Sequence, residues 1–306
     1  MKWRMFLFLG FLSLAASFLN ADVLVMTHAY NKPELIYWQE AALKKFLKED
    51  YTFIVFNDAS NEALSLEIQE ICRSLNVSCV EVPQAIHNYT APYLPGSRNP
   101  LGDPSAECAD TIQYMLDTVG FDYPGIVVVI DSDMFPIREI NLTSLLGDSE
   151  VAAHPQYRKG EHGKVTYFLP NLLVFNMERL IDKRTLNFNI GEIDGVRVDT
   201  GGFTHYYIEQ HPFLKWLKTT CITIPLKDVR NPIDPAIMDF FKNFPKMFQL
   251  ITEMPYDYEF YMDYAFIHFR AGSDWNKMDP AKRAEKMRLF YGALEQILDQ
   301  SFPTNK

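Results

Sequence analysis

The sequence predicts an α/β fold in which helices cover both faces of a parallel sheet. Three short apolar runs, at residues 23–27, 51–56 and 78–82, alternate with helical segments at 33–46 and 63–75. Strands of a parallel sheet are buried on both faces, so they appear as continuous apolar runs without alternation. The order strand, helix, strand, helix, strand is typical of a sheet with right-handed helical crossovers.

The remainder of the chain is predicted to extend this domain. Residues 91–104 are rich in Pro, Gly, Ser and Asn and indicate a loop, and residues 199–203 indicate a turn. We expect strands at 125–130, 151–154, 171–176, 221–225 and 265–269. Helices are expected at 106–119, 178–183, from the turn at 199–203 through 217, and at 280–298. No linker divides the chain, so residues 22–306 are predicted to be one catalytic domain, with 232–255 left unassigned.

The first 21 residues differ from the rest. Lys2 and Arg4 precede an almost wholly apolar run at 5–19, and Ala21 offers a small residue for cleavage. This pattern predicts a secretory signal peptide and therefore an exported protein. The apolar run is shorter than the ~20 residues that span a bilayer. An uncleaved membrane anchor is the first alternative, and a buried first strand is the second.

Composition excludes some partners. The net charge is −10, so the phosphate backbone of a nucleic acid is not an expected ligand. None of the four cysteines, at positions 72, 79, 108 and 221, stands at the spacing of a metal site. A bridge between Cys72 and Cys79 and a set of buried free thiols both stay open.

The fourth strand ends in a pair of carboxylates. Five apolar residues, 126–130, precede Asp131-Ser132-Asp133. Residues i and i+2 of an extended strand face the same side, so both carboxylates can point to one place. Hard oxygen ligands suit Mg²⁺ or Mn²⁺, which keep positions for water and substrate phosphates. The alternative is a solvated turn with two surface acids, which the apolar run makes less favourable.

Polar residues follow two other strands of the same predicted sheet. Thr27-His28 and Asn57-Asp58 end the first and second strands. In open α/β sheets ligands bind beyond the carboxyl ends of the strands. We therefore expect these residues and Asp131 to line one edge of the sheet.

A hydrophobic strand ending in Asp-x-Asp after such a first half resembles the GT-A class of nucleotide-sugar-dependent glycosyltransferases, over residues 23–275. The resemblance implies a Rossmann-type mixed sheet with helices on both faces and Mn²⁺ or Mg²⁺ as cofactor. It implies a UDP- or GDP-sugar donor and a glycan, protein or lipid acceptor. It places four residues near the nucleotide or its phosphates: Thr27, Tyr30, Asp58 and Arg98. Arg98 is equally well explained as a solvated loop charge.

The resemblance extends to the C-terminal part. His268 matches a histidine that completes the metal shell with Asp131 and Asp133, and Asp131 also faces the donor. Arg270 and Ser273 match positions beside the diphosphate. A single histidine at a strand end is more often a satisfied polar residue, so this ligand depends on the resemblance.

Asp199 is the candidate catalytic base. An inverting transferase needs a carboxylate that deprotonates the acceptor hydroxyl, and Asp199-Thr200-Gly201-Gly202 resembles the acidic loop beside the reaction centre. The alternative for Asp199 is an N-cap of the helix that follows. A retaining transferase would not need this base.

The function predicted is a metal-dependent glycosyltransferase, classed as a transferase enzyme. A sugar nucleotidyltransferase shares the early topology but needs a glycine-rich loop after the first strand, and residues 27–33 contain no glycine. An exported glycan-binding or effector protein on a transferase scaffold is the non-enzymatic alternative.

Overall fold

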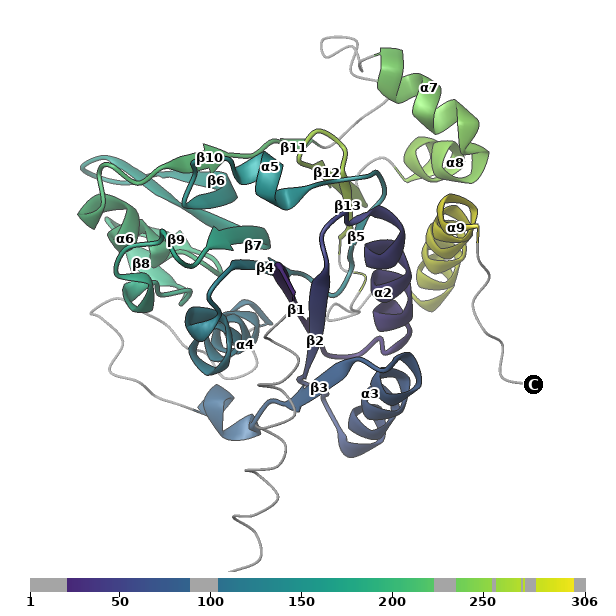
Figure 1. Cartoon of the computed structure of the whole chain (residues 1–306), viewed down its shortest axis with the longest axis horizontal. Coiled ribbons are helices and arrows are strands. Elements are labelled where there is room, and N and C mark those ends of the chain that lie inside the picture. Colours follow the sequence, from purple (N-terminus) through teal and green to yellow (C-terminus); the bar gives the residue numbers. More distant parts are fainter. Residues whose placement is uncertain are drawn as a thin grey trace, which may run out of the picture.

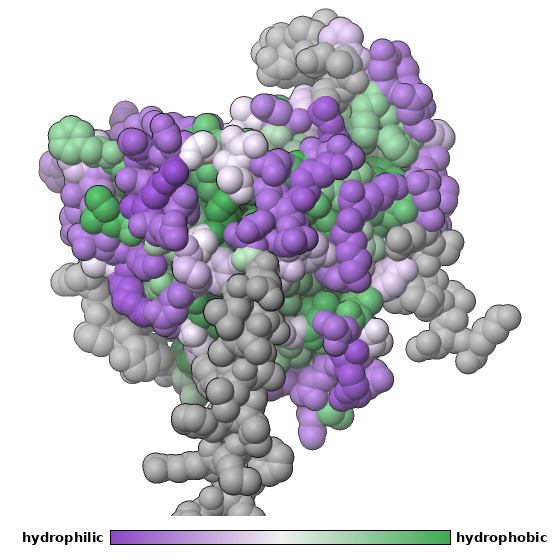
Figure 2. All heavy atoms as spheres, in the orientation of Figure 1, coloured by the Kyte–Doolittle hydropathy of each residue, from purple (hydrophilic) through white to green (hydrophobic). Residues whose placement is uncertain are grey.

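The computed structural model describes residues 21–88, 104–222, 235–254, 257–270, 272 and 279–299. The expected signal segment (apart from residue 21), Arg98 and Ser273 lie outside these residues. Within the described part, no helix is both long and apolar enough to cross a membrane. The face seen in Figure 2 is covered mainly by hydrophilic residues, with smaller apolar areas between them.

The centre of the molecule is a seven-stranded mixed sheet. Its strand order is β10-β6-β7-β4-β1-β2-β3 (Figure 1). The strands β4, β1, β2 and β3 run parallel, whereas β7 is antiparallel to both β4 and β6. Their bounds are β1 (Val23–Ala29), β2 (Tyr51–Asn57), β3 (Ser78–Glu81), β4 (Ile126–Ile130), β6 (Val151–Lys159), β7 (Lys164–Asn176) and β10 (Trp216–Lys218). The predicted mixed α/β fold is confirmed by this sheet and its helices.

Helices cover both faces of the sheet. The helices α2 (Glu34–Phe46) and α3 (Glu62–Leu75) lie on one face, and α4 (Pro104–Thr118) lies on the other (Figure 1). Along β1, Val23 and Val25 pack in the cluster that includes α2 and α3, while Leu24 and Met26 pack with α4. This two-sided burial is the reason why residues 23–26 of the strand are apolar without alternation.

A second, four-stranded sheet continues from the first. Its order is β11-β12-β13-β5 and all its pairs are antiparallel. Its apolar side packs with α2, α7, α8 and α9, where Phe269 stacks on Phe290 with ring centroids 3.9 Å apart. The bounds are β5 (Met134–Pro136), β11 (Cys221–Ile222), β12 (Tyr258–Tyr261), β13 (Phe266–Phe269), α7 (Pro235–Asn243), α8 (Pro245–Glu253) and α9 (Pro280–Leu298). The unassigned segment 232–255 thus contains two helices.

Two expectations about helices were wrong. The helix expected through residue 217 ends at residue 210 as α6 (Thr204–Gln210), and β10 follows it in parallel register with β6. Pro212 disfavours the helical conformation of the residue before it, which explains the early end. Residues 178–182 form turns rather than a helix, and residue 183 begins the short helix η3. The remaining elements are α5 (Leu142–Leu146), β8 (Gly191–Ile193), β9 (Val196–Val198), η1 (Gln84–Asn88), η2 (Gly120–Asp122) and η3 (Lys183–Thr185).

Candidate metal centre

Asp131-Ser132-Asp133 is the connection between the two sheets. It leaves β4 of the large sheet and enters β5 of the small one, and the N–H of Met134 donates to the carbonyl of Asp131 at 3.1 Å. The three residues therefore form a tight turn, and the extended geometry expected for them was wrong. The chain must turn here because β5 pairs with β13 rather than continuing along β4. The turn still aims both carboxylates at His268.

Each sheet supplies a neighbour to this turn. On the large sheet, the N–H of Asp131 donates to the carbonyl of Asn171 at 3.0 Å, and Asn171 Nδ2 donates to Asp131 Oδ2 at 2.5 Å. On the small sheet, His268 pairs with Met134, and the N–H of Phe269 donates to the carbonyl of Asp133 at 2.8 Å. Strand pairing thus places His268 beside a turn that lies 135 or more residues earlier in the chain.

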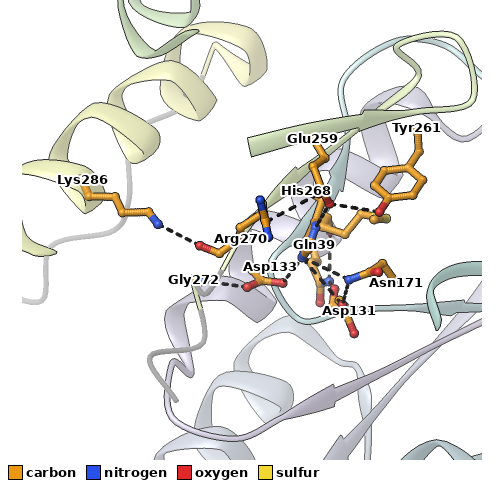
Figure 3. A network of polar contacts seen from close by, with 11 residues as sticks. Gln39, Asp131, Asp133, Asn171, Glu259, Tyr261, His268, Arg270, Gly272 and Lys286 are labelled. Atoms are coloured by element: carbon orange, nitrogen blue, oxygen red, sulfur yellow. Dashed lines mark hydrogen bonds and ion pairs between the residues drawn. The ribbon is translucent and has the colours of Figure 1, made fainter. Parts of the chain in front are cut away.

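Asp131, Asp133 and His268 form a group that could hold a divalent cation. One ligand atom from each lies within 4.8 Å of the others. His268 Nε2 lies 3.2 Å from Asp133 Oδ1 and 3.7 Å from Asp131 Oδ2 (Figure 3). Two carboxylates and one imidazole are an accepted donor set for Mn²⁺.

The second ring nitrogen of His268 is held by Glu259. Its Nδ1 lies 3.1 Å from Glu259 Oε2, and the hydroxyl of Tyr261 donates to the same oxygen at 3.1 Å. Glu259 stands opposite His268 in the β12–β13 pairing. This contact fixes the ring so that Nε2 faces Asp131 and Asp133, as in the carboxylate–histidine–metal arrangement of many metalloproteins. The residues therefore fit a bound cation.

The charges at the centre agree with this interpretation. Burial lowers the pKa of His268, but the carboxylates of Asp133, Glu259 and Asp131 outweigh it and raise the pKa to about 10. The pKa of Asp131 is raised first by burial, against the lowering effect of His268, and further by Asp133. Burial raises the pKa of Glu259, but His268 lowers it below the usual value. Three carboxylates around one imidazole leave net negative charge, which a divalent cation would neutralise when it displaces the Nε2 proton.

Backbone and side-chain contacts from outside the motif hold the turn. Gln39 Nε2, on α2, donates to the carbonyl of Asp131 at 2.7 Å and to that of Met134 at 3.1 Å. The N–H of Gly272 donates to Asp133 Oδ2 at 2.7 Å. A Cβ on Gly272 would lie 2.8 Å from the Cβ of Asp133, so only glycine allows this approach.

A buried lysine supports the same loop from α9. The Nζ of Lys286 donates to the carbonyl of Arg270 at 2.8 Å and to Asp257 Oδ1 at 3.0 Å, and it lies 4.7 Å from the ring centroid of Phe269. Gln39, Glu259 and Lys286 were not predicted from the sequence. The one local sequence feature that pointed to any of them was Glu259, a charged residue inside the aromatic run 258–261.

Of the predicted nucleotide-side residues, Thr27, Tyr30 and Asp58 lie at the carboxyl ends of β1 and β2 in the large sheet, whereas Arg270 follows β13 of the small sheet. Thr27 is fully buried, and its hydroxyl has no hydrogen-bond partner in the described part of the chain. Burial raises the pKa of the half-buried Tyr30 hydroxyl, and Glu107 and Asp58 raise it further. Arg270 is exposed, with its Nε 3.6 Å from Glu259 Oε1.

Asp58 belongs to a separate polar cluster. Its Oδ1 lies 2.9 Å from His87 Nε2, and its Oδ2 accepts the hydroxyl of Thr111 at 2.8 Å. His87 Nδ1 lies 3.6 Å from Asp110 Oδ2. Burial lowers the pKa of His87, but the neighbouring carboxylates of Asp110 and Asp58 outweigh it and raise the pKa to about 10. The Asp58 carboxylate is thus already engaged by protein groups.

Asp199 is exposed and does not cap a helix. Its Oδ1 accepts the N–H of Thr200 at 2.9 Å, whereas α6 begins five residues later, after Phe203, without a side-chain cap. The N-cap alternative was therefore wrong. The neighbouring Thr200 donates its hydroxyl to the carbonyl of Ser105 at 2.8 Å, which places Asp199 beside the first turn of α4.

No protein-family model and no curated protein matches this chain. Among solved structures, the apo structure of the bifunctional glycosyltransferase WbbM is similar, with a TM-score of 0.43 and 14% identity. The similarity covers 73% of this chain and 44% of that one, so this chain spans less than half of that protein. The fold class given above depends on the observed sheet and helices rather than on this similarity.

Proposed function

We propose that the protein is a metal-dependent glycosyltransferase that uses a nucleotide-diphosphate sugar. The observation that carries the proposal is the Asp131–Asp133–His268 group, with Glu259 fixing the imidazole, at the carboxyl edge of a mixed α/β sheet. Ligands of open α/β sheets bind at this edge. The sequence resemblance to GT-A enzymes gives the reaction class.

The cation is proposed to be Mn²⁺ or Mg²⁺. Asp131, Asp133 and His268 would hold it, and three protein ligands leave positions for water and for diphosphate oxygens. When bound, the cation supplies the positive charge that stabilises a diphosphate leaving group. Arg270, exposed beside the centre, adds a cationic group for the phosphates. Ser273 and Arg98 are proposed to contact the same phosphates.

The nucleotide is proposed to lie over the ends of β1 and β2. The hydroxyl of Tyr30 and the buried, unpartnered hydroxyl of Thr27 are the polar groups proposed to contact it there. A contact from Asp58 to the ribose or base would replace one of its hydrogen bonds to His87 or Thr111.

The acceptor side is assigned to Asp199. The exposed carboxylate of Asp199 is proposed to take the proton of an acceptor hydroxyl as the bond to the sugar forms. An Asp199→Asn variant is expected to bind donor normally and to release nucleotide from it roughly 10²–10⁴-fold more slowly. Unchanged turnover in this variant would remove Asp199 from the reaction. The acceptor, a glycan, protein or lipid, is proposed to be met in the secretory pathway or outside the cell, because residues 1–21 have the pattern of an export signal.

Calorimetry with UDP- and GDP-sugars, with and without Mn²⁺, tests the proposal. Wild-type protein is expected to bind one of these donors only when Mn²⁺ is present. Asp133→Asn should lose that binding, while Asp148→Asn, a change of an exposed acid outside the centre, should keep it. Metal-independent binding, or equal binding by Asp133→Asn, would contradict the proposal. Absence of donor binding in the wild-type protein would favour a glycan-binding or effector role.

A further inference from the structure

A second group of potential metal ligands shares Asp131 with the first. One ligand atom each from His28, Cys108 and Asp131 lies within 4.8 Å of the others. His28 stands near the end of β1, Cys108 is on α4, and Asp131 follows β4. All three residues are half-buried.

A ring nitrogen of His28 without a hydrogen-bond partner favours a cation bound by this second group. The Nδ1 of His28 is buried and has no hydrogen-bond partner within the described residues. A buried nitrogen without a partner costs stability, because the water that it loses on folding is not replaced. A bound cation would satisfy this nitrogen.

The surroundings of Cys108 point the same way. Cys108 is a free thiol on the side of α4 that faces the end of the sheet. Its Sγ lies within 4.8 Å of a carboxylate oxygen of Asp131 and of a ring nitrogen of His28. A cation that coordinates a thiol at such a place removes the thiol proton.

We propose that His28, Cys108 and Asp131 bind a second divalent cation of the thiophilic class, represented by Zn²⁺. Imidazole, thiolate and carboxylate are the three ligand types of zinc sites, and three protein ligands leave one position open. The first group contains no sulfur and therefore suits Mn²⁺ or Mg²⁺ better. The S–H bond of Cys108 breaks as the metal–sulfur bond forms, and the proton passes to solvent.

The two cations would share one carboxylate. Asp131 contributes to both groups, while Asp133 and His268 belong to the first alone, and His28 and Cys108 to the second alone. The inference depends on the same carboxylate as the proposed function, but it does not require the protein to be a transferase. The second site can therefore be tested without nucleotide or sugar.

Cadmium reports directly on thiolate coordination through its sulfur-to-metal charge-transfer absorbance. The thiols of Cys72 and Cys79 contact each other and could bind cadmium themselves, so the parent protein for the test is Cys79→Ser. When this full-length parent is titrated with Cd²⁺, the charge-transfer absorbance is expected to saturate at one thiolate-bound cation per chain. A further Cys108→Ser change should abolish the absorbance, and Cys221→Ser, outside the group, should leave it unchanged.

The His28→Gln variant gives a second readout that keeps all thiols of the parent. Its Cd²⁺ affinity should fall by at least the roughly 10–100-fold that loss of a supporting residue costs at metal sites. Equal absorbance with and without Cys108, or equal affinity with and without His28, would overturn the proposal. If Cys108→Ser does not fold, the His28→Gln result decides.

The proposed function and the second site fail separately in this design. Asp133→Asn removes a ligand from the first group alone, so the cadmium absorbance should persist in it. A persistent absorbance together with absent Mn²⁺-dependent donor binding would refute the transferase and support the second site. Loss of the absorbance in Asp133→Asn would contradict the assignment of Asp133 to the first group alone.

Discussion

Glu259 is predicted to set the cation affinity of the centre although it is not a ligand. Its Oε2 lies 3.1 Å from His268 Nδ1, while Nε2 of the same ring lies 3.2 Å from Asp133 Oδ1. A Glu259→Gln change keeps the shape of the side chain but removes the charge that orients the ring and raises its basicity. Loss of such a supporting carboxylate typically weakens metal binding roughly 10–100-fold, or about 1.4–2.7 kcal/mol.

Titration with Mn²⁺, followed by the electron paramagnetic resonance of the free ion, measures this effect. The matched control is Glu139→Gln, which changes an exposed carboxylate whose partner is Lys48 at the surface. Equal Mn²⁺ affinity in Glu259→Gln and wild type would refute the argument that Glu259 prepares His268 for a metal. An equal loss in Glu139→Gln would show that the effect is one of overall charge.

Three further predictions concern the surroundings of the centre. Gly272→Ala should weaken Mn²⁺ binding, because its Cβ would lie 2.8 Å from the Cβ of Asp133. Gly292→Ala in α9 has space for the added methyl group, so it should raise the free energy of unfolding in urea by roughly 0.5–1 kcal/mol. Lys286→Met should lower the free energy of unfolding by roughly 1–3 kcal/mol through lost buried hydrogen bonds, and Lys282→Met, on the exposed side of the same helix, should not. Two flanking carboxylates raise the folded pKa of His87 to about 10 despite its burial, whereas the unfolded pKa is ~6.5. The contribution of His87 to the free energy of unfolding is therefore complete below about pH 6.5 and is lost as the pH rises towards 10. Unfolding titrations across this range should show a flatter pH profile for His87→Gln, and an unchanged slope would contradict the ion-pair cluster.

The sequence predicted the large sheet apart from β10, and it predicted Asp131-Ser132-Asp133, because these features depend on local patterns. A strand segment buried on two faces must be apolar, and β1, β2 and β4 are apolar over residues 23–26, 53–56 and 126–130. The carboxylates then stand out at the end of β4. His268 was predicted by resemblance, and the structure explains its place through the pairing of β13 with β5.

The β12–β13 hairpin could not be predicted from its turn. Met262, Asp263 and Tyr264 all have positive φ, of 49°, 51° and 65°. Three consecutive residues other than glycine are rare in this region, so the sequence carries no recognisable turn there. Without that hairpin, Glu259 could not be placed opposite His268.

Two other contacts depend on tertiary packing alone. Gln39 and Lys286 belong to helices whose apolar faces were predictable. The packing of α2 and α9 against the small sheet brings Gln39 to the turn and Lys286 to the carbonyl of Arg270. No spacing within the sequence links Gln39 to Asp131, which lies 92 residues later.

The central claim is that one hard divalent cation binds between the Asp131 and Asp133 carboxylates and His268. The most direct test is anomalous X-ray scattering at the manganese edge from crystals grown with Mn²⁺ and a nucleoside diphosphate. We expect a manganese peak in contact with both carboxylates and with Nε2 of His268, the nitrogen that faces away from Glu259. A peak elsewhere, or none at this position under saturating Mn²⁺, would contradict the proposed metal centre.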